Sequence, residues 1–181
     1  IKKGVGNVDL DQIGVGYGFK PGQMHREIDA VTSIIDRSSY DVDLWVQRGC
    51  GYQGMDVFLN ISMSDLRNLS TAELSAKLVN TTPIEYAFMS TGVARGKGLN
   101  TTGGITFNIY APKGTKMMYI EPISQFGNGA GRSWDGLSKQ QYFGNEAEML
   151  FQRGTKFRIK KVERNGDTIY IDMEVIEQVV N

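Results

Sequence analysis

The sequence has little of the two side chains that support most metal sites and many nucleophilic enzymes: one cysteine, Cys50, and one histidine, His25. A single cysteine excludes a disulfide within the chain and a cysteine-based zinc site. A single histidine excludes a multi-histidine metal site, and His25 falls on a predicted amphipathic helix, where a surface role is a simpler interpretation than a Ser-His or Cys-His pair. If the protein is an enzyme, carboxylates, hydroxyls and arginines must carry its chemistry, and we predict no metal.

The chain also lacks an excess of charge and any long apolar run. Its 20 lysines and arginines offset 20 aspartates and glutamates, so nothing attracts it to nucleic acid or to an anionic membrane. No apolar stretch approaches the roughly 18 to 20 residues that span a bilayer, and the N-terminus lacks the charged-then-apolar order of a signal peptide. We expect neither nucleic acid nor a membrane as a partner of this segment. Because the chain begins with Ile1, we expect it to be a piece of a longer protein.

Length and periodicity predict one folded domain with an N-terminal extension. Residues 1–22 are rich in glycine and lack helical periodicity, which indicates an irregular arm or linker. We expect residues 23–181 to form the domain, since 181 residues can bury a substantial core. Apolar residues at helical spacing predict an amphipathic helix over 24–37. The S-x-x-E pattern that starts at Ser70 is a capping box and predicts a second helix over 70–79.

Most of the remaining chain is predicted to be strands. Alternating apolar residues predict strands at 44–49, 84–88, 105–110, 117–121, 157–163 and 168–177. Asn165-Gly166 between the last two predicts a hairpin. Two long loops, 93–104 and 124–145, contain no P-loop or dinucleotide-binding glycine motif. Because helices and strands do not alternate regularly, the order predicts an α+β domain.

Two carboxylates, Glu146 and Glu148, stand directly before an apolar run that begins at Met149. In an extended chain, residues separated by one position project to the same side, so both carboxylates would face one cleft. Spacing alone nevertheless favours a pair of solvated surface charges. Arg48-Gly49 at a strand end has two equally good interpretations. It is either a place where the backbone closely approaches a ligand or a simple turn. Ser90 can tether a neighbouring carboxylate or cap a turn.

Taken in order, three segments resemble a known family: Trp45-Val46-Gln47-Arg48-Gly49, Phe88-Met89-Ser90-Thr91-Gly92 and Glu146-Ala147-Glu148. They resemble the R, S-T-S and E-x-E pattern of the mono-ADP-ribosyltransferases, in the bacterial exoenzyme branch that includes the actin-modifying toxins. The resemblance covers about residues 39 to 178. It implies an α+β fold, an ADP-ribosyltransferase-like β-sandwich of two mostly antiparallel sheets with flanking N-terminal helices. It also makes residues 23–181 the catalytic domain.

The resemblance implies NAD as the co-substrate and assigns its contacts. Arg48 would hold the NAD phosphates, and Arg95 in the first long loop would be a second phosphate ligand. The Gly49 backbone would meet the nicotinamide amide, and Thr91 would shape the floor of the pocket. Two residues depart from the pattern and bear on NAD affinity more than on mechanism: Gly92 stands where the third S-T-S residue is usually serine, and Ala87 stands where some toxins have asparagine.

The resemblance also assigns the chemistry. Ser90 would orient Glu148, the catalytic carboxylate, which would contact the nicotinamide ribose and stabilise the positive charge that develops as the bond to nicotinamide breaks. Glu146 would accept a proton from the attacking nucleophile; in this family E-x-E accompanies arginine as the acceptor. Phe143, with Tyr142 beside it, would contact the substrate protein.

The sequence therefore predicts an NAD-dependent, arginine-specific mono-ADP-ribosyltransferase that acts on a protein. We expect a toxin or effector, secreted or delivered into a host cell, that acts in the host cytoplasm on a host protein such as actin or a small GTPase. Two alternatives stay open. One is an NAD glycohydrolase with water as the only acceptor. The other is a non-catalytic binding domain of a phage or toxin-associated protein.

Overall fold

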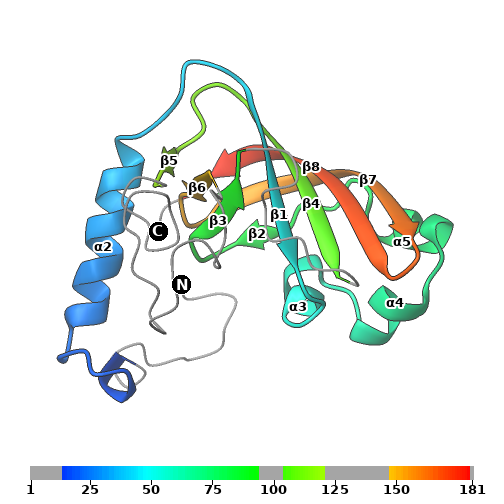
Figure 1. Ribbon diagram of the computed structural model, residues 1–181, viewed down its shortest axis with the longest axis horizontal. Coiled ribbons are helices and arrows are strands. Elements are labelled where there is room, and N and C mark those ends of the chain that lie inside the picture. The colour runs from blue at the N-terminus through cyan, green and yellow to red at the C-terminus, as the bar shows by residue number, and fades with distance from the viewer. Residues whose placement is uncertain (1–13, 94–103, 121–146, 180–181) are drawn as a thin grey trace, which may run out of the picture.

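The computed structural model describes residues 14–93, 104–120 and 147–179. The helices are α2 (Gln23–Asp36), α3 (Met55–Leu59), α4 (Met63–Asn68) and α5 (Thr71–Leu78). The strands are β1 (Leu44–Cys50), β2 (Ile84–Glu85), β3 (Met89–Gly92), β4 (Ile105–Ala111), β5 (Met117–Tyr119), β6 (Glu148–Phe151), β7 (Thr155–Asn165) and β8 (Thr168–Gln178). Figure 1 shows a bent sheet with a long helix, α2, at one end, α4 and α5 at the other, and α3 below the middle of the sheet. Among the described residues, no helix has both the length and the apolar character of a membrane span.

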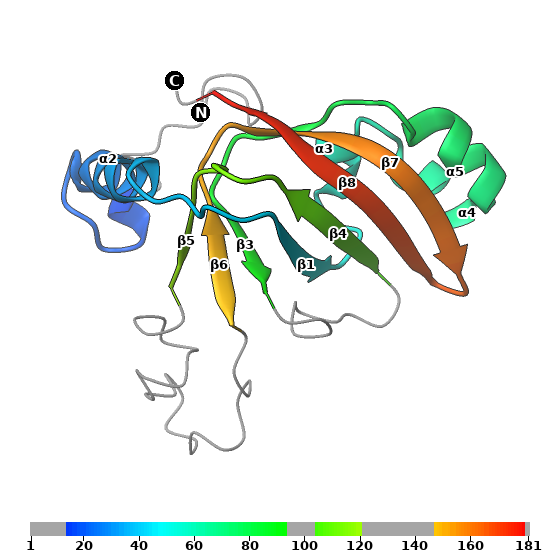
Figure 2. The same cartoon turned by 90° about the horizontal axis from the view of Figure 1, so that it is seen from above.

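The eight described strands form one hydrogen-bonded sheet in the order β2-β7-β8-β4-β1-β3-β6-β5. Strands β4 and β8 are parallel, and the other pairs are antiparallel. Strand β1 meets β3 through one register pair, Gln47 with Gly92, and Figure 2 shows β3, β6 and β5 running steeply across the direction of β1, β4, β8 and β7. The α+β prediction is confirmed, and its two mostly antiparallel layers are the two halves of this sheet, continuous through β1 and β3.

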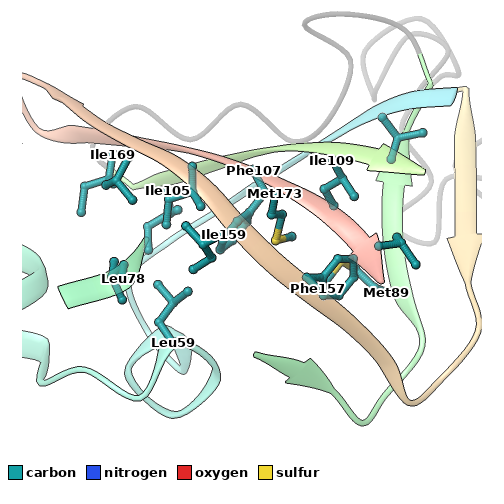
Figure 3. Packing of buried hydrophobic residues seen from close by; sticks show 14 of the residues in the cluster. Leu59, Leu78, Met89, Ile105, Phe107, Ile109, Phe157, Ile159, Ile169 and Met173 are labelled. Atoms are coloured by element: carbon teal, nitrogen blue, oxygen red, sulfur yellow. The ribbon is translucent and has the colours of Figure 1, made fainter. Parts of the chain in front are cut away.

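The core lies between the two halves of the sheet and between the sheet and the short helices (Figure 3). Phe107 of β4 and Phe157 of β7 are 1% and 0% exposed, and Phe151 of β6 is 0% exposed. The Phe151 and Phe157 rings meet edge to face at 6.1 Å between centroids, which joins the two halves directly. Burial of each such side chain contributes about 1.5 to 3 kcal/mol, so these rings stabilise the packing of the two halves.

The two predicted helices are confirmed, and two shorter ones were not predicted. Helix α2 occupies the predicted amphipathic segment. Ahead of α5, the backbone N–H of Ser70 donates to Glu73 Oε2 at 2.9 Å, and the full capping box is present. Helices α3 and α4 have 5 and 6 residues, too few for a periodic apolar stripe. The signal for α4 was its N-cap, where Ser62 Oγ accepts from the backbone N–H of Asp65 at 3.0 Å.

The strand predicted over 84–88 is wrong as a single element. Strand β2 ends at Glu85 and pairs with β7, whereas β3 begins at Met89 and pairs with β6. Between them, the Glu85 carboxylate accepts from the Ala87 backbone N–H at 3.0 Å, which turns the chain. Ser90 therefore lies within a strand and not at the mouth of one. The predicted hairpin is confirmed, because Asn165 pairs with Thr168 across the turn.

Candidate active site

Strands β3 and β6 bring Ser90 and Glu148 together. Gly92 pairs with Glu148, and Ser90 with Leu150, so Ser90, Gly92 and Glu148 share one face of the sheet. The alternate residues, Met89, Thr91, Met149 and Phe151, are buried on the other face. Ser90 Oγ donates to Glu148 Oε1 at 2.6 Å. Hydrogen bonds to a carboxylate at this length are roughly twice as strong as neutral ones, so the hydroxyl fixes the orientation of the carboxylate.

Arg48 connects β1 to the same pair. Its Nη1 donates to the backbone carbonyl of Ser90 at 2.8 Å, and the side chain is half-buried. This contact holds β1 against β3 beyond their single register pair. Burial raises the pKa of the nearby Cys50 thiol, and the Arg48 charge opposes this shift in pKa. The thiol therefore stays protonated near neutral pH, which disfavours Cys50 as a nucleophile.

Thr91 joins β3 and β6 from the core side. It is 4% exposed, and its Oγ1 donates to the Met149 carbonyl at 2.8 Å. Gly49 is buried in β1, opposite Thr106 of β4. The roles predicted for Thr91 and Gly49 in NAD binding remain predictions.

The segment leading into Glu148 is not extended. Ala147 has φ 47°, and the other two described non-glycine residues with positive φ are asparagines. A left-handed alanine costs roughly 1 to 2 kcal/mol, and its carbonyl accepts from the Val93 backbone N–H at 3.0 Å. The prediction that Glu146 and Glu148 project to the same side assumed an extended segment. The left-handed backbone of Ala147 removes that assumption. Glu146 itself lies outside the described residues, as do Arg95, Tyr142 and Phe143.

A cavity of about 540 Å³ opens beside β1 and the end of β3. Its lining consists of Trp45, Val46, Gln47, Gly92, Val93, Asn108, Tyr170 and Asp172. Gln47 Nε2 donates to Asn108 Oδ1 at 2.8 Å, and Asn108 Nδ2 donates to Asp172 Oδ1 at 2.7 Å. Gln47 and Asn108 are register partners, as are Asn108 and Asp172, so the hydrogen bonds run straight across β1, β4 and β8. One wall of the cavity is therefore a polar row that ends on a carboxylate.

Sequence reasoning missed this row. The only local signal was polar residues at alternate positions of apolar strands, as at Asn108 within β4. That pattern is typical of any solvated sheet face. In the part of the chain that the structure describes, no group of three or more histidine, cysteine, aspartate or glutamate side chains could hold a metal ion.

Solved structures of bacterial toxins share the fold. C3stau2 from S. aureus, determined with NAD, is 21% identical, with a TM-score of 0.61 over 85% of this chain and 71% of that one. Plx2a, an ADP-ribosyltransferase toxin from Paenibacillus larvae, is 20% identical, with a TM-score of 0.62 over 90% of this chain and 75% of that one. BECa of a C. perfringens binary enterotoxin, determined with NADH, is 16% identical, with a TM-score of 0.62 over 95% of this chain and 37% of that one.

At these identities, the solved structures establish the fold and not the activity. No curated protein matches the chain in sequence. The sequence model of the ADP-ribosyltransferase exoenzyme family, however, matches residues 10–178, which is nearly the whole chain. The arginine, the serine and the carboxylate that carried the resemblance all fall within that range. The chain therefore belongs to the ADP-ribosyltransferase exoenzyme family.

Proposed function

We propose that this protein cleaves NAD between nicotinamide and ribose and transfers the ADP-ribose to an arginine side chain of a substrate protein. Family membership supports the reaction class. One observation carries the assignment of the catalytic group: the 2.6 Å hydrogen bond from Ser90 Oγ to Glu148 Oε1. A carboxylate held this way can face a ribose without reorienting during the reaction.

Glu148 is the catalytic residue in this proposal. Departure of nicotinamide leaves positive charge on the ribose, and a fixed carboxylate beside the ring stabilises that charge more in the transition state than in the ground state. Ser90 positions Glu148, and Arg48 positions Ser90 through the 2.8 Å contact to its carbonyl. Strands β1, β3 and β6 thus contribute Arg48, Ser90 and Glu148, respectively.

The residues present fit NAD. Bound NAD supplies the ADP-ribose group and the nicotinamide leaving group. Arg48 and Arg95 would hold the phosphates, Thr91 would shape the floor of the pocket, and the Gly49 backbone would meet the nicotinamide amide. The cavity next to Gly92, the register partner of Glu148, gives room for the part of NAD that extends away from the catalytic carboxylate.

The proposal that the acceptor is an arginine depends on Glu146. A guanidinium is cationic and becomes nucleophilic only beside a base, so the first carboxylate of E-x-E would accept the proton. Phe143 and Tyr142 would contact the substrate protein. Since Plx2a of the same fold is named a toxin, we extend the proposal to a toxin or effector that is secreted or delivered into a host cell. Its target in the host cytoplasm would be a protein such as actin or a small GTPase.

The test is incubation of the protein with labelled NAD and poly-arginine, then with host-cell lysate, followed by mass spectrometry of the products. We expect release of nicotinamide together with label on arginine side chains. Release of nicotinamide with free ADP-ribose and no labelled acceptor would instead establish a glycohydrolase. Absence of NAD binding by calorimetry would contradict both activities and favour a non-catalytic binding domain.

A further inference from the structure

Asp172 of β8 is a half-buried carboxylate in the lining of the cavity. Its Oδ1 accepts from Asn108 Nδ2 at 2.7 Å, and no lysine or arginine of the described residues forms an ion pair with it. Lys161, its register partner on β7, is basic, but Lys161 Nζ lies 2.8 Å from Glu163 Oε1. A carboxylate partly removed from water is stabilised by a cation, and here the cation has to come from outside the described chain.

The polar row that leads to Asp172 holds this carboxylate in one orientation. An ionised carboxylate only accepts hydrogen bonds, so Asn108 presents its amide N–H to Asp172 and its Oδ1 to Gln47. Gln47 in turn donates to Asn108 at 2.8 Å, which fixes the amide that fixes Asp172. The bond to Asn108 uses Oδ1, and Oδ2 remains for a ligand. A group oriented in this way loses little conformational freedom when a ligand binds.

Two exposed aromatic side chains share the cavity with Asp172. Trp45 is 60% exposed and Tyr170 is 38% exposed, and both line the cavity. Tyr170 precedes Asp172 by two positions on β8, so both side chains project from the same face of the strand. The Trp45 ring packs against Tyr110 at 5.2 Å between centroids, a contact that supports the ring while most of it stays exposed. Aromatic faces near a carboxylate favour a cation that is itself flat.

The cavity lies on the face of the sheet that carries Glu148. Register pairs lead from Glu148 through Gly92, Gln47 and Asn108 to Asp172. At about 4.8 Å between neighbouring strands, these four steps separate the outer two Cα atoms by at most about 19 Å. Asp172 is therefore too far from Glu148 to hold the side chain that is modified. It is near enough for another part of the same substrate protein to reach.

We infer that the Asp172 end of the cavity binds an arginine side chain of the substrate protein, other than the arginine that receives ADP-ribose. The inference rests on the proposed function, because it takes the partner to be the protein that is modified. A guanidinium is planar, stays charged and donates from five N–H groups. It can therefore pair with Asp172 Oδ2 while it stacks on Tyr170 or Trp45. At about 540 Å³ the cavity is larger than one side chain, so its Gly92 end stays open to NAD.

The test measures binding and does not require catalysis. Calorimetry without NAD would give the Kd of a tetra-arginine peptide and of its tetra-citrulline and tetra-lysine counterparts. Citrulline keeps the shape of arginine but has no charge, and lysine keeps the charge but has no flat group. We expect the wild type to bind tetra-arginine more tightly than either counterpart.

Asp172→Asn should raise the Kd of tetra-arginine about three- to tenfold at low salt, because an ion pair with hydrogen bonds is lost. The Kd of tetra-citrulline should change less than twofold. Asp167→Asn is the matched control, because Asp167 is an exposed carboxylate at the turn before β8 and does not line the cavity. It should leave the Kd of tetra-arginine within about twofold of the wild type.

Trp45→Leu supplies a second variant at an exposed position, in case Asp172→Asn does not fold. We expect it to weaken tetra-arginine more than tetra-lysine, because the flat face for the guanidinium is lost. Thermal unfolding provides the structural readout. The asparagine oxygen at position 172 can still accept from Asn108, so the Tm of Asp172→Asn should stay close to that of the wild type.

Three results would overturn the inference: no binding of tetra-arginine to the wild type, an unchanged tetra-arginine Kd in Asp172→Asn, or an equal loss of the arginine and citrulline peptides. The proposed function fails in a different way, through the absence of ADP-ribose transfer to arginine by the wild type. In that case the Kd values still decide whether Asp172 binds a guanidinium.

Discussion

Glu148 is controlled by residues from two other strands. Ser90 Oγ holds one carboxylate oxygen, and Arg48 holds the carbonyl of Ser90, so the orientation of Glu148 depends on side chains up to 100 positions away in sequence. Ala147 adds a backbone in the left-handed region immediately before it. Strain of this kind persists only where the surrounding structure imposes it, and it is common at active sites. Each of these groups acts on the position of one carboxylate.

Replacing Glu148 by glutamine tests the carboxylate itself. The amide keeps the shape of the side chain but loses the negative charge that stabilises the developing cation. We expect the rate of NAD cleavage to fall about a hundred- to a thousandfold, measured as nicotinamide release. Glu163→Gln, an exposed carboxylate on β7, is the matched control and should retain wild-type rates. Full transferase activity in Glu148→Gln would remove Glu148 from the mechanism.

Replacing Glu146 by glutamine separates the two carboxylates. If Glu146 is the base for the acceptor, Glu146→Gln should lower arginine modification at least about tenfold while NAD hydrolysis by water continues. The measurement is the ratio of labelled poly-arginine to free ADP-ribose at equal NAD consumption. A parallel loss of both products would show that Glu146 serves bond cleavage and not acceptor activation.

The turns and strand ends set the positions of these residues. Gly154, between β6 and β7, has φ 74°, and a Cβ placed there would lie 1.9 Å from the Val179 carbonyl oxygen. Its own N–H donates to the Glu85 carbonyl at 2.8 Å, so the turn also holds β2. The turn therefore has no room for a side chain at Gly154, and it connects β6 directly to β7.

Gly154→Ala should consequently be among the most damaging single substitutions. It combines a left-handed backbone with a clash against a backbone atom, and we expect a loss of about 4 kcal/mol or more in the free energy of unfolding. Gly166→Ala is the matched control, because Gly166 has φ 58° and an added methyl group would meet nothing within 4 Å. It should cost about 1 to 2 kcal/mol. Urea unfolding measures the loss in the free energy of unfolding for each variant. Similar losses in the two would show that the steric contact at Gly154 has little effect.

The start of β1 is held by a carboxylate whose pKa is lowered. The backbone N–H of Lys113 and the Tyr110 hydroxyl both donate to Asp43, at 2.8 and 2.7 Å, and together they lower its pKa below the usual 3.8. The folded state thus favours the ionised form, and its contribution to stability is present above pH 3.8 and is lost as the pH falls through the lowered folded-state pKa. We expect Asp43→Asn to make the urea midpoint fall less steeply below that pH than in the wild type. An unchanged acid slope would contradict this linkage.

At the scale of the whole molecule, the bent sheet brings distant residues into one row. Successive register pairs join Glu148 to Gly92, Gly92 to Gln47, Gln47 to Asn108 and Asn108 to Asp172. The Glu148 carboxylate and the far wall of the cavity are thereby placed on one face by five strands. Each of these residues comes from a different strand, so only pairing across the sheet makes them neighbours.

Helix α2 is tied to this arrangement through Gln152, which follows β6. Gln152 is 0% exposed, and its Nε2 donates to the Thr32 carbonyl at 2.8 Å. Gln152→Ala would leave buried groups unsatisfied, and we expect a loss of about 1 to 3 kcal/mol in the free energy of unfolding. Gln53→Ala, at an exposed position, should be near neutral. An equally small effect at both positions would mean that α2 does not depend on this contact.

The sequence by itself could predict those elements that depend on interactions between residues close together in the chain. Helix α2, the capping box at Ser70 and the hairpin at Asn165-Gly166 depend on residues within a few positions of one another, and periodicity or turn preference specifies them directly. The roles implied for Glu148, Ser90 and Arg48 likewise came from short motifs in a fixed order. The family match to residues 10–178 bears out that resemblance.

Only the tertiary structure decided how these pieces meet. Ser90 reaches Glu148 across 58 positions because β3 pairs with β6, a pairing set by the burial of Met89, Thr91, Met149 and Phe151 on the far face. The division of 84–88 into two strands and the left-handed Ala147 follow from the same long-range packing. Periodicity reports which face of a strand is buried, but the choice of neighbouring strand depends on apolar surfaces contributed by the whole chain.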